Sequence, residues 1–310
     1  MILATRQSPL AMAQAHYVQA QLALLYPDCQ TKLLPLLTEG DRRQDVSLSK
    51  IGGKGLFIKA LEEALLQKKA DAAVHSLKDL PATLPDGFSI VAVLNRQYPF
   101  DAFVSNRYAH IDDLPLGSVV GTSSIRRSAQ LSLFYPELVV RPLRGNLATR
   151  LKKLDDGQFD ALILASAGLH RLGLADRICH EMSIDTMLPA AGQGALAIEV
   201  HEANLQPILS QQLASLNDDK LSFCVAAERA FSEALGGGCH MPLAAYATYA
   251  DDQIQLSVRL LDSGQHGLLE TQKTACIASV EAAKKLGQEA ADTLFELGAQ
   301  AILDRLNNQG

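Results

Sequence analysis

The segment Ser118-Val119-Val120-Gly121-Thr122-Ser123-Ser124-Ile125-Arg126-Arg127 contains a strand, a turn and a helix start in immediate succession. Residues 118–121 are mostly apolar, residues 122–124 form a polar turn, and a helical pattern continues to about Phe134. A buried strand followed at once by a turn and a helix is the repeating unit of open parallel α/β sheets. The segment therefore predicts an α/β fold and places two arginines just past the carboxyl end of a strand.

The same unit recurs through the first two-thirds of the chain. Further strands, each followed by a polar or glycine-containing turn and a helical pattern, are predicted at residues 2–4, 72–74, 138–143 and 161–164. Ser8 is the predicted N-cap of the first helix, with Pro9 at its first position, and Asn146 can cap the helix that carries Arg150. This alternation predicts doubly wound sheets of parallel strands.

Ligand-type side chains follow the strands in all five units. An arginine, lysine or aspartate stands just past each strand's carboxyl end, often beside the first turn of a helix, whose unpaired N–H groups attract anions. A solvated surface charge is the simpler interpretation of any one of these residues. Taken together, the five units predict that a ligand binds at the edge of the sheets where the parallel strands end.

The arginines form a basic segment within an acidic protein. The 310-residue chain has a formal net charge of −6. Between Ser118 and Lys153, seven Lys and Arg residues stand against one acidic residue, Glu137, so this segment carries +6 and the rest of the chain −12. Nucleic-acid binding would require a broad basic face, so the pattern favours a specific small anion as the ligand and argues against nucleic acid.

The cysteines and the apolar runs indicate the compartment. The five cysteines are widely scattered and include no C-x-x-C pair, which argues against a disulfide framework and a zinc knuckle; they are Cys29, Cys179, Cys224, Cys239 and Cys276. No apolar run approaches the roughly 20 residues of a membrane helix, and residues 1–4 are predicted as a strand and not as a signal peptide. We therefore expect a cytoplasmic protein with no metal and no membrane partner.

A different pattern begins near residue 215. A helical stretch over 221–235 precedes strand patterns at 243–249, 254–261 and 268–276, and Ser279 caps a long amphipathic helix that runs to the C-terminus. Before the first of these strands, three glycines precede Cys239, which is therefore expected on a flexible loop with its thiol available for covalent chemistry. The alternative for this thiol is an inert, half-buried cysteine on a turn.

A polar, glycine-rich segment over residues 40–57 is predicted to be an active-site lid. It contains two runs, Gly40-Asp41-Arg42-Arg43-Gln44-Asp45 and Lys50-Ile51-Gly52-Gly53-Lys54-Gly55-Leu56-Phe57. Neither run has the spacing or the Lys-Ser/Thr ending of a Walker A loop, so nucleotide binding is not indicated.

Several of these motifs, in this order, resemble those of the porphobilinogen deaminase (hydroxymethylbilane synthase) family of haem and tetrapyrrole biosynthesis. The resemblance spans essentially the whole chain and rests on TRQSPLA (5–11), GGKGLF (52–57), VHSLKD (74–79), GTSSIRR (121–127), LRGN (143–146), AGQG (191–194) and GGC (237–239). It implies a monomeric transferase that condenses four porphobilinogen molecules onto a covalently bound dipyrromethane primer. Ammonia is released at each condensation, and linear hydroxymethylbilane is then released by hydrolysis.

The resemblance also implies an architecture. Two periplasmic-binding-protein-like lobes would comprise residues 1–95 with 194–214 and residues 96–193. A C-terminal α+β domain with a three-stranded antiparallel sheet would comprise residues 215–310 and carry Cys239.

The family's functional residues can be matched position by position. The cysteine matching Cys239 holds the dipyrromethane through a thioether in that family. Asp79 matches the catalytic carboxylate that stabilises the cationic azafulvene formed by loss of ammonia, while its alternative role is to cap the turn at Leu80-Pro81. The matches to cofactor-binding residues are Lys78, Thr122, Ser124, Arg126, Arg127 and Arg144. The matches to substrate-binding residues are Arg6, Ser8, Phe57, Arg150, Arg171 and Gln193, of which Phe57 is equally well explained as a core residue.

The chemistry of the substrate agrees with these matches. Every pyrrole unit carries acetate and propionate groups, and guanidinium forks hold carboxylates better than lysine does. The sequence departs from the family at His240-Met241, where glutamine or valine-type residues often follow the cysteine, and an imidazole there could alter the reactivity of the thiol.

Two other functions compete with this interpretation. A non-catalytic, two-lobed binding protein for a small carboxylated anion would share the fold, but it predicts a signal peptide and gives Cys239 no role. A zinc enzyme that uses Cys239, His240 and Cys224 requires a further ligand that the spacing does not identify.

Overall fold

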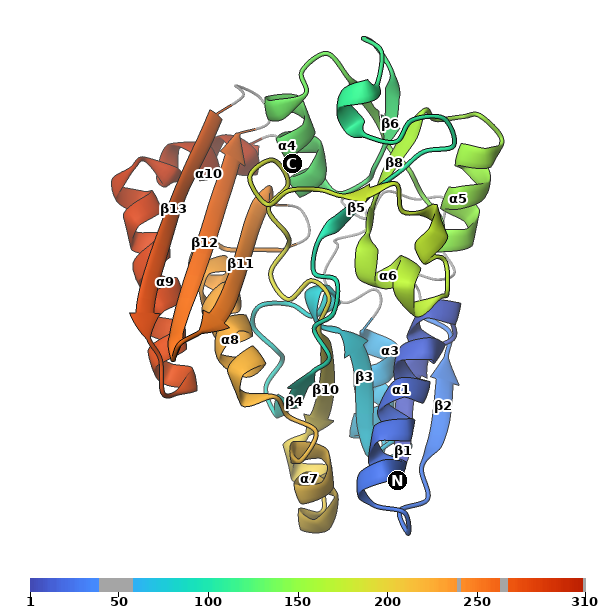
Figure 1. The fold of residues 1–310 in the computed structure, drawn as a ribbon. Helices are drawn as coiled ribbons and strands as arrows, with labels where there is room; N and C mark the ends of the chain where they lie inside the picture. The colour runs from blue at the N-terminus through green and yellow to red at the C-terminus, as the bar shows by residue number, and fades with distance from the viewer. Residues whose placement is uncertain (39–57, 239–240, 263–266, 309–310) are drawn as a thin grey trace. The chain divides into compact units, whose positions relative to one another are not determined.

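The computed structural model describes residues 1–38, 58–238, 241–262 and 267–308 (Figure 1). The chain forms two compact units, one of residues 1–97 with 194–222 and one of residues 98–193 with 223–310. The second unit contains two separate sheets, each with its own apolar core. The predicted division into three domains at residues 95, 193 and 214 stays a prediction.

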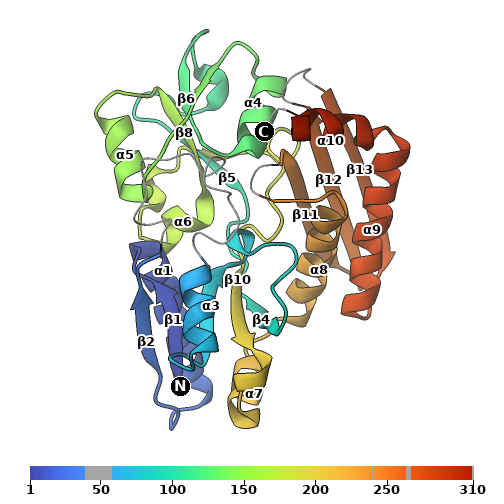
Figure 2. The same cartoon turned by 180° about the vertical axis from the view of Figure 1, so that it is seen from behind.

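The first unit is a five-stranded sheet in the order β2-β1-β3-β10-β4. Its elements are β1 (Ile2–Arg6), α1 (Pro9–Leu25), β2 (Lys32–Leu36), α3 (Lys59–Leu66), β3 (Ala72–Ser76), β4 (Phe88–Leu94), β10 (Leu196–His201) and α7 (Pro207–Ala214). Helices α1 and α3 cover opposite faces of the sheet (Figures 1 and 2). Successive residues of β1 explain this, because Leu3 packs in the cluster with α1 and Ala4 in the cluster with α3.

The first sheet of the second unit has the order β7-β6-β8-β5-β9. Its elements are β5 (Asp101–Val104), β6 (Val119–Gly121), α4 (Ile125–Phe134), β7 (Val139–Arg141), α5 (Leu147–Asp155), β8 (Ala161–Ala165), α6 (Ser166–Arg171) and β9 (His180–Glu181). Leu131 of α4 packs on one face with Phe103, and Leu151 of α5 packs on the other face with Leu164.

The predicted helix starts are confirmed. Ser8 accepts a hydrogen bond from the Ala11 N–H at 3.3 Å, and Asn146 accepts one from the Thr149 N–H at 2.9 Å. Pro9 is the first residue of α1, as expected for a residue whose missing N–H is not needed there. Short polar side chains thus begin these helices just past the strand ends.

The predicted α/β fold is confirmed, and both of its sheets also contain antiparallel strands that the sequence pattern did not predict. The predicted strands β1 and β3 are parallel to each other, and β6 is parallel to both β7 and β8. In contrast, β10 is antiparallel to β3 and β4, and β5 is antiparallel to β8. These two strands follow segments that cross between the units of the chain, not βαβ connections, and an apolar run does not reveal its direction.

The C-terminal part of the second unit is a three-stranded antiparallel sheet in the order β11-β12-β13 with helices on one face. Its elements are α8 (Asp219–Ala234), β11 (Leu243–Ala250), β12 (Gln253–Asp262), β13 (Gly267–Cys276), α9 (Val280–Glu296) and α10 (Ala299–Asn308). Phe231 of α8, Leu256 of β12 and Leu294 of α9 are fully buried in its core. All three predicted strands are confirmed.

The predicted single C-terminal helix is wrong. Ser279 does cap α9, since it accepts a hydrogen bond from the Ala282 N–H at 3.1 Å, but this helix ends at Glu296 and α10 begins at Ala299. Gly298 between them has φ = +100°, a conformation that glycine adopts at low cost. A glycine inside an amphipathic pattern is thus a helix end here.

Candidate active site

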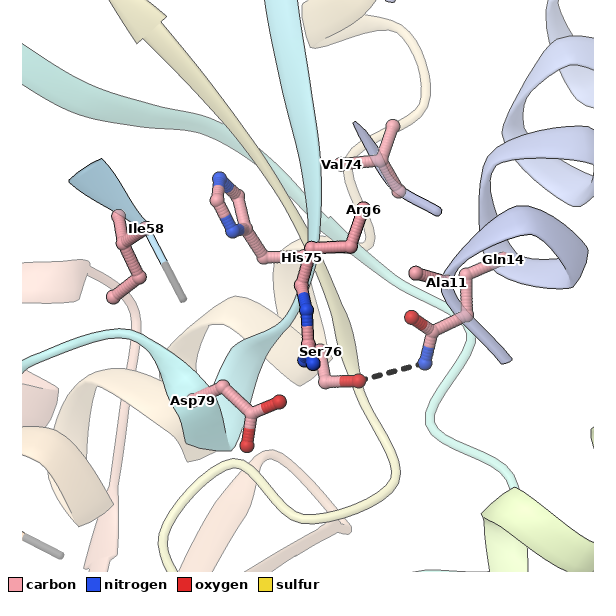
Figure 3. A pocket seen from close by; sticks show the side chains of 8 residues that line it. All are labelled: Arg6, Ala11, Gln14, Ile58, Val74, His75, Ser76 and Asp79. Atoms are coloured by element: carbon pink, nitrogen blue, oxygen red, sulfur yellow. Dashed lines mark hydrogen bonds between the residues drawn. The ribbon is translucent and has the colours of Figure 1, made fainter. Parts of the chain in front are cut away.

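The first group of predicted site residues lies where β1 and β3 end. These strands are parallel neighbours, with Leu3 opposite Ala72 and Ala4 opposite Ala73, so Arg6 and Ser76 reach the same edge of the sheet. A small cavity opens there, lined by Arg6, Ala11, Gln14, Ile58, Val74, His75, Ser76 and Asp79 (Figure 3). In this unit, a cavity therefore lies at the edge of the sheet where the sequence predicts ligand binding.

Asp79 ends the 3-10 turn Leu77–Asp79, which follows β3 directly. Its side chain is exposed and makes no hydrogen bond to another described residue. The turn is closed by the Leu80 N–H, which donates to the Leu77 carbonyl at 3.1 Å. Backbone atoms therefore close this turn, which weighs against the capping role for the carboxylate.

Two of the residues that line this cavity are hydrogen-bonded to each other. The Gln14 amide of α1 donates to the Ser76 hydroxyl at 2.7 Å, as Figure 3 shows. In the same view, the Ser76 hydroxyl and the His75 ring point to opposite sides of the strand. Arg6, Ser8 and Lys78 are half-buried.

A histidine that lines this cavity contacts a buried carboxylate on the neighbouring strand. His75 Nε2 of β3 is 2.9 Å from Glu199 Oε2 of β10, and both side chains are almost fully buried. Burial and the charge of Glu199 raise the pKa of Glu62 on α3, and His75 partly opposes this shift. The sequence analysis missed Glu199, whose place inside an apolar strand was an available signal.

The second group lies in the second unit, where Arg126 and Arg127 begin α4. Both guanidinium groups are buried and share the carboxylate of Asp101, which opens β5. Arg126 Nη1 is 2.8 Å from Asp101 Oδ2, and Arg127 Nη2 is 2.7 Å from Oδ1. Burial lowers the pKa of the Arg127 guanidinium, and Asp101 opposes that shift. Two cations and one anion leave these three buried side chains with a net charge of +1.

Gln193 joins the same cluster. Its amide nitrogen donates to Asp101 Oδ1 at 3.0 Å and to the Pro99 carbonyl at 2.8 Å. The structure therefore places Gln193 beside the arginines through Asp101, a residue that the sequence analysis did not name. An acidic residue that opens a buried strand was the signal that could have identified it.

The turn before α4 is fixed by its own hydroxyl groups. Thr122 is buried and its hydroxyl accepts from the Ser124 N–H at 3.2 Å, while Ser124 accepts from the Arg127 N–H at 3.4 Å. Ser123 bonds both backbone groups of Leu143, the residue before Arg144. These contacts connect the turns that follow β6 and β7.

The remaining arginines follow neighbouring strands. Strand β6 is parallel to both β7 and β8, so the turns after all three lie at one edge. Arg144 and Arg150 follow β7, Arg171 ends the helix after β8, and all three are half-buried. Arg150 Nε donates to the Gly145 carbonyl at 2.8 Å. The second unit thus gathers most of the basic segment at the carboxyl ends of its parallel strands.

Several predictions fall on residues that the structure does not describe. Phe57, Cys239, His240 and the predicted lid over 40–57 lie outside the described residues. Cys224, the other cysteine of the zinc alternative, is buried in the apolar core of the C-terminal sheet. Among the described residues, no group of three or more His, Cys, Asp or Glu side chains could hold a metal ion, and no helix is long and apolar enough to cross a membrane.

The fold is that of an α/β protein, with arginines gathered at the carboxyl ends of parallel strands in its second unit. Comparison with known families matches residues 1–207 to the porphobilinogen deaminase, dipyromethane cofactor binding domain, and residues 222–296 to the porphobilinogen deaminase C-terminal domain. The chain belongs to the porphobilinogen deaminase family. It is a hydroxymethylbilane synthase, a transferase of tetrapyrrole biosynthesis whose substrate is porphobilinogen and whose cofactor is a dipyrromethane.

Curated relatives agree along almost the whole length. The porphobilinogen deaminase of Chromobacterium violaceum is 51% identical over 302 residues, covering 97% of this chain and 96% of that protein. The porphobilinogen deaminase of Thiobacillus denitrificans is 50% identical over 304 residues, covering 98% of each.

Solved structures include more distant matches. A periplasmic substrate-binding protein of an ABC transporter from Coxiella burnetii has a TM-score of 0.45 and 15% identity, and it covers 70% of this chain and 91% of its own. A methionine-bound nutrient binding protein from Burkholderia cenocepacia has a TM-score of 0.43 and 13% identity, and it covers 69% of this chain and 89% of its own.

Proposed function

We propose that Asp79 is the catalytic carboxylate of this hydroxymethylbilane synthase. The observation that carries the proposal is its place at the edge where β1 and β3 end, exposed beside the cavity that Arg6 and Ser76 also line. A carboxylate there can accept hydrogen bonds from pyrrole N–H groups. It can also stabilise the positive charge that develops on the pyrrole when ammonia leaves, which is the charge that the reaction must accommodate.

The substrate carboxylates are assigned to the basic side chains around the strand ends. Arg6, Ser8, Arg150, Arg171 and Gln193 are the proposed contacts on the substrate side, together with Phe57. Half-buried guanidinium groups bind carboxylates through two parallel hydrogen bonds and hold the ring in a fixed orientation. Arg6 is the last residue of β1 and lines the same cavity as Asp79. Because its proposed role is to hold a substrate carboxylate, removing Arg6 is expected to weaken substrate binding more than it slows the chemical step.

The residues at the start of α4 fit a carboxylate-bearing cofactor. The Arg126 Nε is buried and has no hydrogen-bond partner among the described residues, and the cluster with Arg127 and Asp101 keeps a net positive charge. A buried net charge is costly unless an anion compensates it. When bound, the dipyrromethane supplies an electron-rich pyrrole carbon as the acceptor. The residues proposed to hold it are Lys78, Thr122, Ser124, Arg126, Arg127 and Arg144, with Cys239 as the thioether anchor.

The same proposal extends to the setting of the enzyme. We extend the proposal to a monomeric enzyme, as the family resemblance implies. The scattered cysteines support a reducing, cytoplasmic compartment, because four of them are free thiols in the described structure.

The test of the catalytic assignment is a single-turnover measurement on Asp79→Asn. This change keeps the size of the side chain but removes its charge, so the rate should fall by about 100- to 1000-fold with little change in the thermal midpoint. Loss of a turn cap would instead cost about 1 kcal/mol of stability and leave turnover per folded molecule nearly normal. That second result would refute the assignment. Asp86→Asn, an exposed carboxylate beyond the site, is the matched control.

A further inference from the structure

The orientation of Arg126 depends on a backbone carbonyl as well as on Asp101. Its Nη1 donates to the Leu188 carbonyl at 2.6 Å, and the side chain is only 5% exposed. Because a buried guanidinium makes its contacts in a fixed geometry, the place of that carbonyl helps to set the direction of the fork.

The Leu188 peptide is itself held by the side chain of Gln130. The Gln130 carboxamide accepts from the Leu188 N–H at 2.8 Å and donates to the Leu188 carbonyl at 3.2 Å. Gln130 is fully buried and lies one turn after Arg126 on α4, on the same face of the helix. One glutamine thus fixes both backbone groups of the residue that orients the arginine.

Gln130 is in turn contacted by an arginine from the C-terminal sheet. Arg259 Nη1 of β12 donates to Gln130 Oε1 at 3.2 Å and to the Ile184 carbonyl at 3.2 Å, and Nη2 donates to the Asp185 carbonyl at 2.8 Å. Only 8% of Arg259 is exposed. Its Nε is paired with the more exposed Glu270 at 2.8 Å, and all of these contacts lie within the second unit.

The face of the sheet explains why Arg259 reaches α4. Leu256, Val258 and Leu260 of β12 point into the core beneath the helices. The residues between them, including Arg259, therefore point to the opposite face. The Arg259 guanidinium carbon also lies 5.5 Å from the centre of the Phe134 ring at the end of α4. The C-terminal sheet thus contacts α4 through a side chain that is both charged and buried.

We infer that Gln130 and Arg259 are positioning residues for Arg126, and that they couple the C-terminal sheet to cofactor binding. This inference rests on the proposed role of Arg126. Arg259 fixes the Gln130 amide, Gln130 fixes the Leu188 peptide, and the Leu188 carbonyl orients the guanidinium toward the carboxylate of the cofactor. Neither residue needs to touch the cofactor itself.

The test compares the rate at which apoprotein acquires its cofactor when incubated with porphobilinogen. Intact mass under denaturing conditions gives the loaded fraction over time, at a temperature where every variant is folded. Gln130→Leu and Arg259→Met remove the hydrogen bonds at similar side-chain size. Both should load about tenfold more slowly, since roughly 1.4 kcal/mol of lost orientation corresponds to a factor of ten. If Gln130→Leu does not fold, Arg259→Met on a different element tests the same connection.

Two controls separate positioning from stability. Glu270→Gln breaks only the exposed end of the Arg259 network and should load normally. Arg305→Met breaks the pair with the buried Asp262 in the same sheet, which does not involve Gln130, so it should lower the thermal midpoint without slowing loading. Equal slowing in Arg305→Met would mean a general stability effect and would overturn the inference.

An Arg126→Met variant distinguishes the inference from its premise. Slow loading of this variant together with normal loading of Gln130→Leu and Arg259→Met would overturn the positioning roles and leave the role of Arg126 intact. Normal loading of Arg126→Met would show instead that the proposed role of Arg126 is wrong.

Discussion

At the scale of single residues, charge and burial together distinguish the two groups of site residues. Asp79 is an exposed carboxylate beside a half-buried arginine, whereas Asp101 is a fully buried carboxylate between two arginines. A buried acid of the second kind stabilises and orients cations, since removing it would leave two unpaired charges in the interior. The sequence motifs predicted the arginines, but the acid that holds them is distant in sequence and has no motif of its own.

The raised pKa of Glu62 predicts a pH-dependent effect on stability. A carboxyl group whose pKa is raised in the folded state favours folding below its unfolded value, near 4.5, and this contribution is lost as the pH rises through the raised folded value. Glu62→Gln should therefore raise the thermal midpoint at pH 7 by about 1–2 °C, because the side chain is only half-buried, and should change it little at pH 4. Thermal melts at both pH values check this. The exposed neighbour Glu63→Gln is the control, and an equal shift at both pH values would contradict the explanation.

At the scale of elements, the sequence predicts where helices begin, but it does not predict the direction of strands that pair with distant parts of the chain. The caps Ser8, Asn146 and Ser279 are set by residues within one turn of each helix start, and all three are confirmed. The antiparallel strands β5 and β10 pair with partners far along the chain, so no local pattern fixes their direction. The break at Gly298 is an intermediate case, because a glycine in a helical pattern can be either a helix end or a close packing contact.

Gly287 is a glycine that allows two helices to pack closely. It lies in the middle of α9, and a Cβ at this position would be 2.2 Å from the Ala227 carbonyl oxygen and 2.9 Å from the Phe231 nitrogen of α8. Alanine is the better helix former by about 1 kcal/mol, but overpacking against a backbone typically costs about 1–3 kcal/mol or more. Gly287→Ala is therefore expected to lower the free energy of unfolding, as measured by denaturant titration. The exposed change Glu289→Ala on the same helix should leave it nearly unchanged, and a stabilised Gly287→Ala would mean that the two helices separate easily.

At the scale of the whole molecule, the proposed function draws on residues from distant parts of the chain. Asp79 and Arg6 lie in the first unit, and the arginines of the basic segment and the sheet that follows residue 239 lie in the second. The division of roles stays a prediction from the motifs and the charge, since the +6 segment stands out against an acidic remainder. The sequence could not predict the Arg259 connection, since that depends on which face of β12 meets α4.

The covalent cofactor is a property of the whole chain that a mass measurement can test. The family resemblance assigns the thioether to Cys239, which three glycines precede in the sequence between α8 and β11. Denatured protein should be heavier than its sequence by the mass of a dipyrromethane. Cys239→Ser should lose this mass and nearly all turnover, because a hydroxyl is a far weaker nucleophile than a thiolate. Cys276→Ser, which alters an exposed free thiol on β13, should keep both. An active preparation whose mass equals that of the bare chain, or a Cys239→Ser variant that retains the added mass, would show that the cofactor is not held through Cys239.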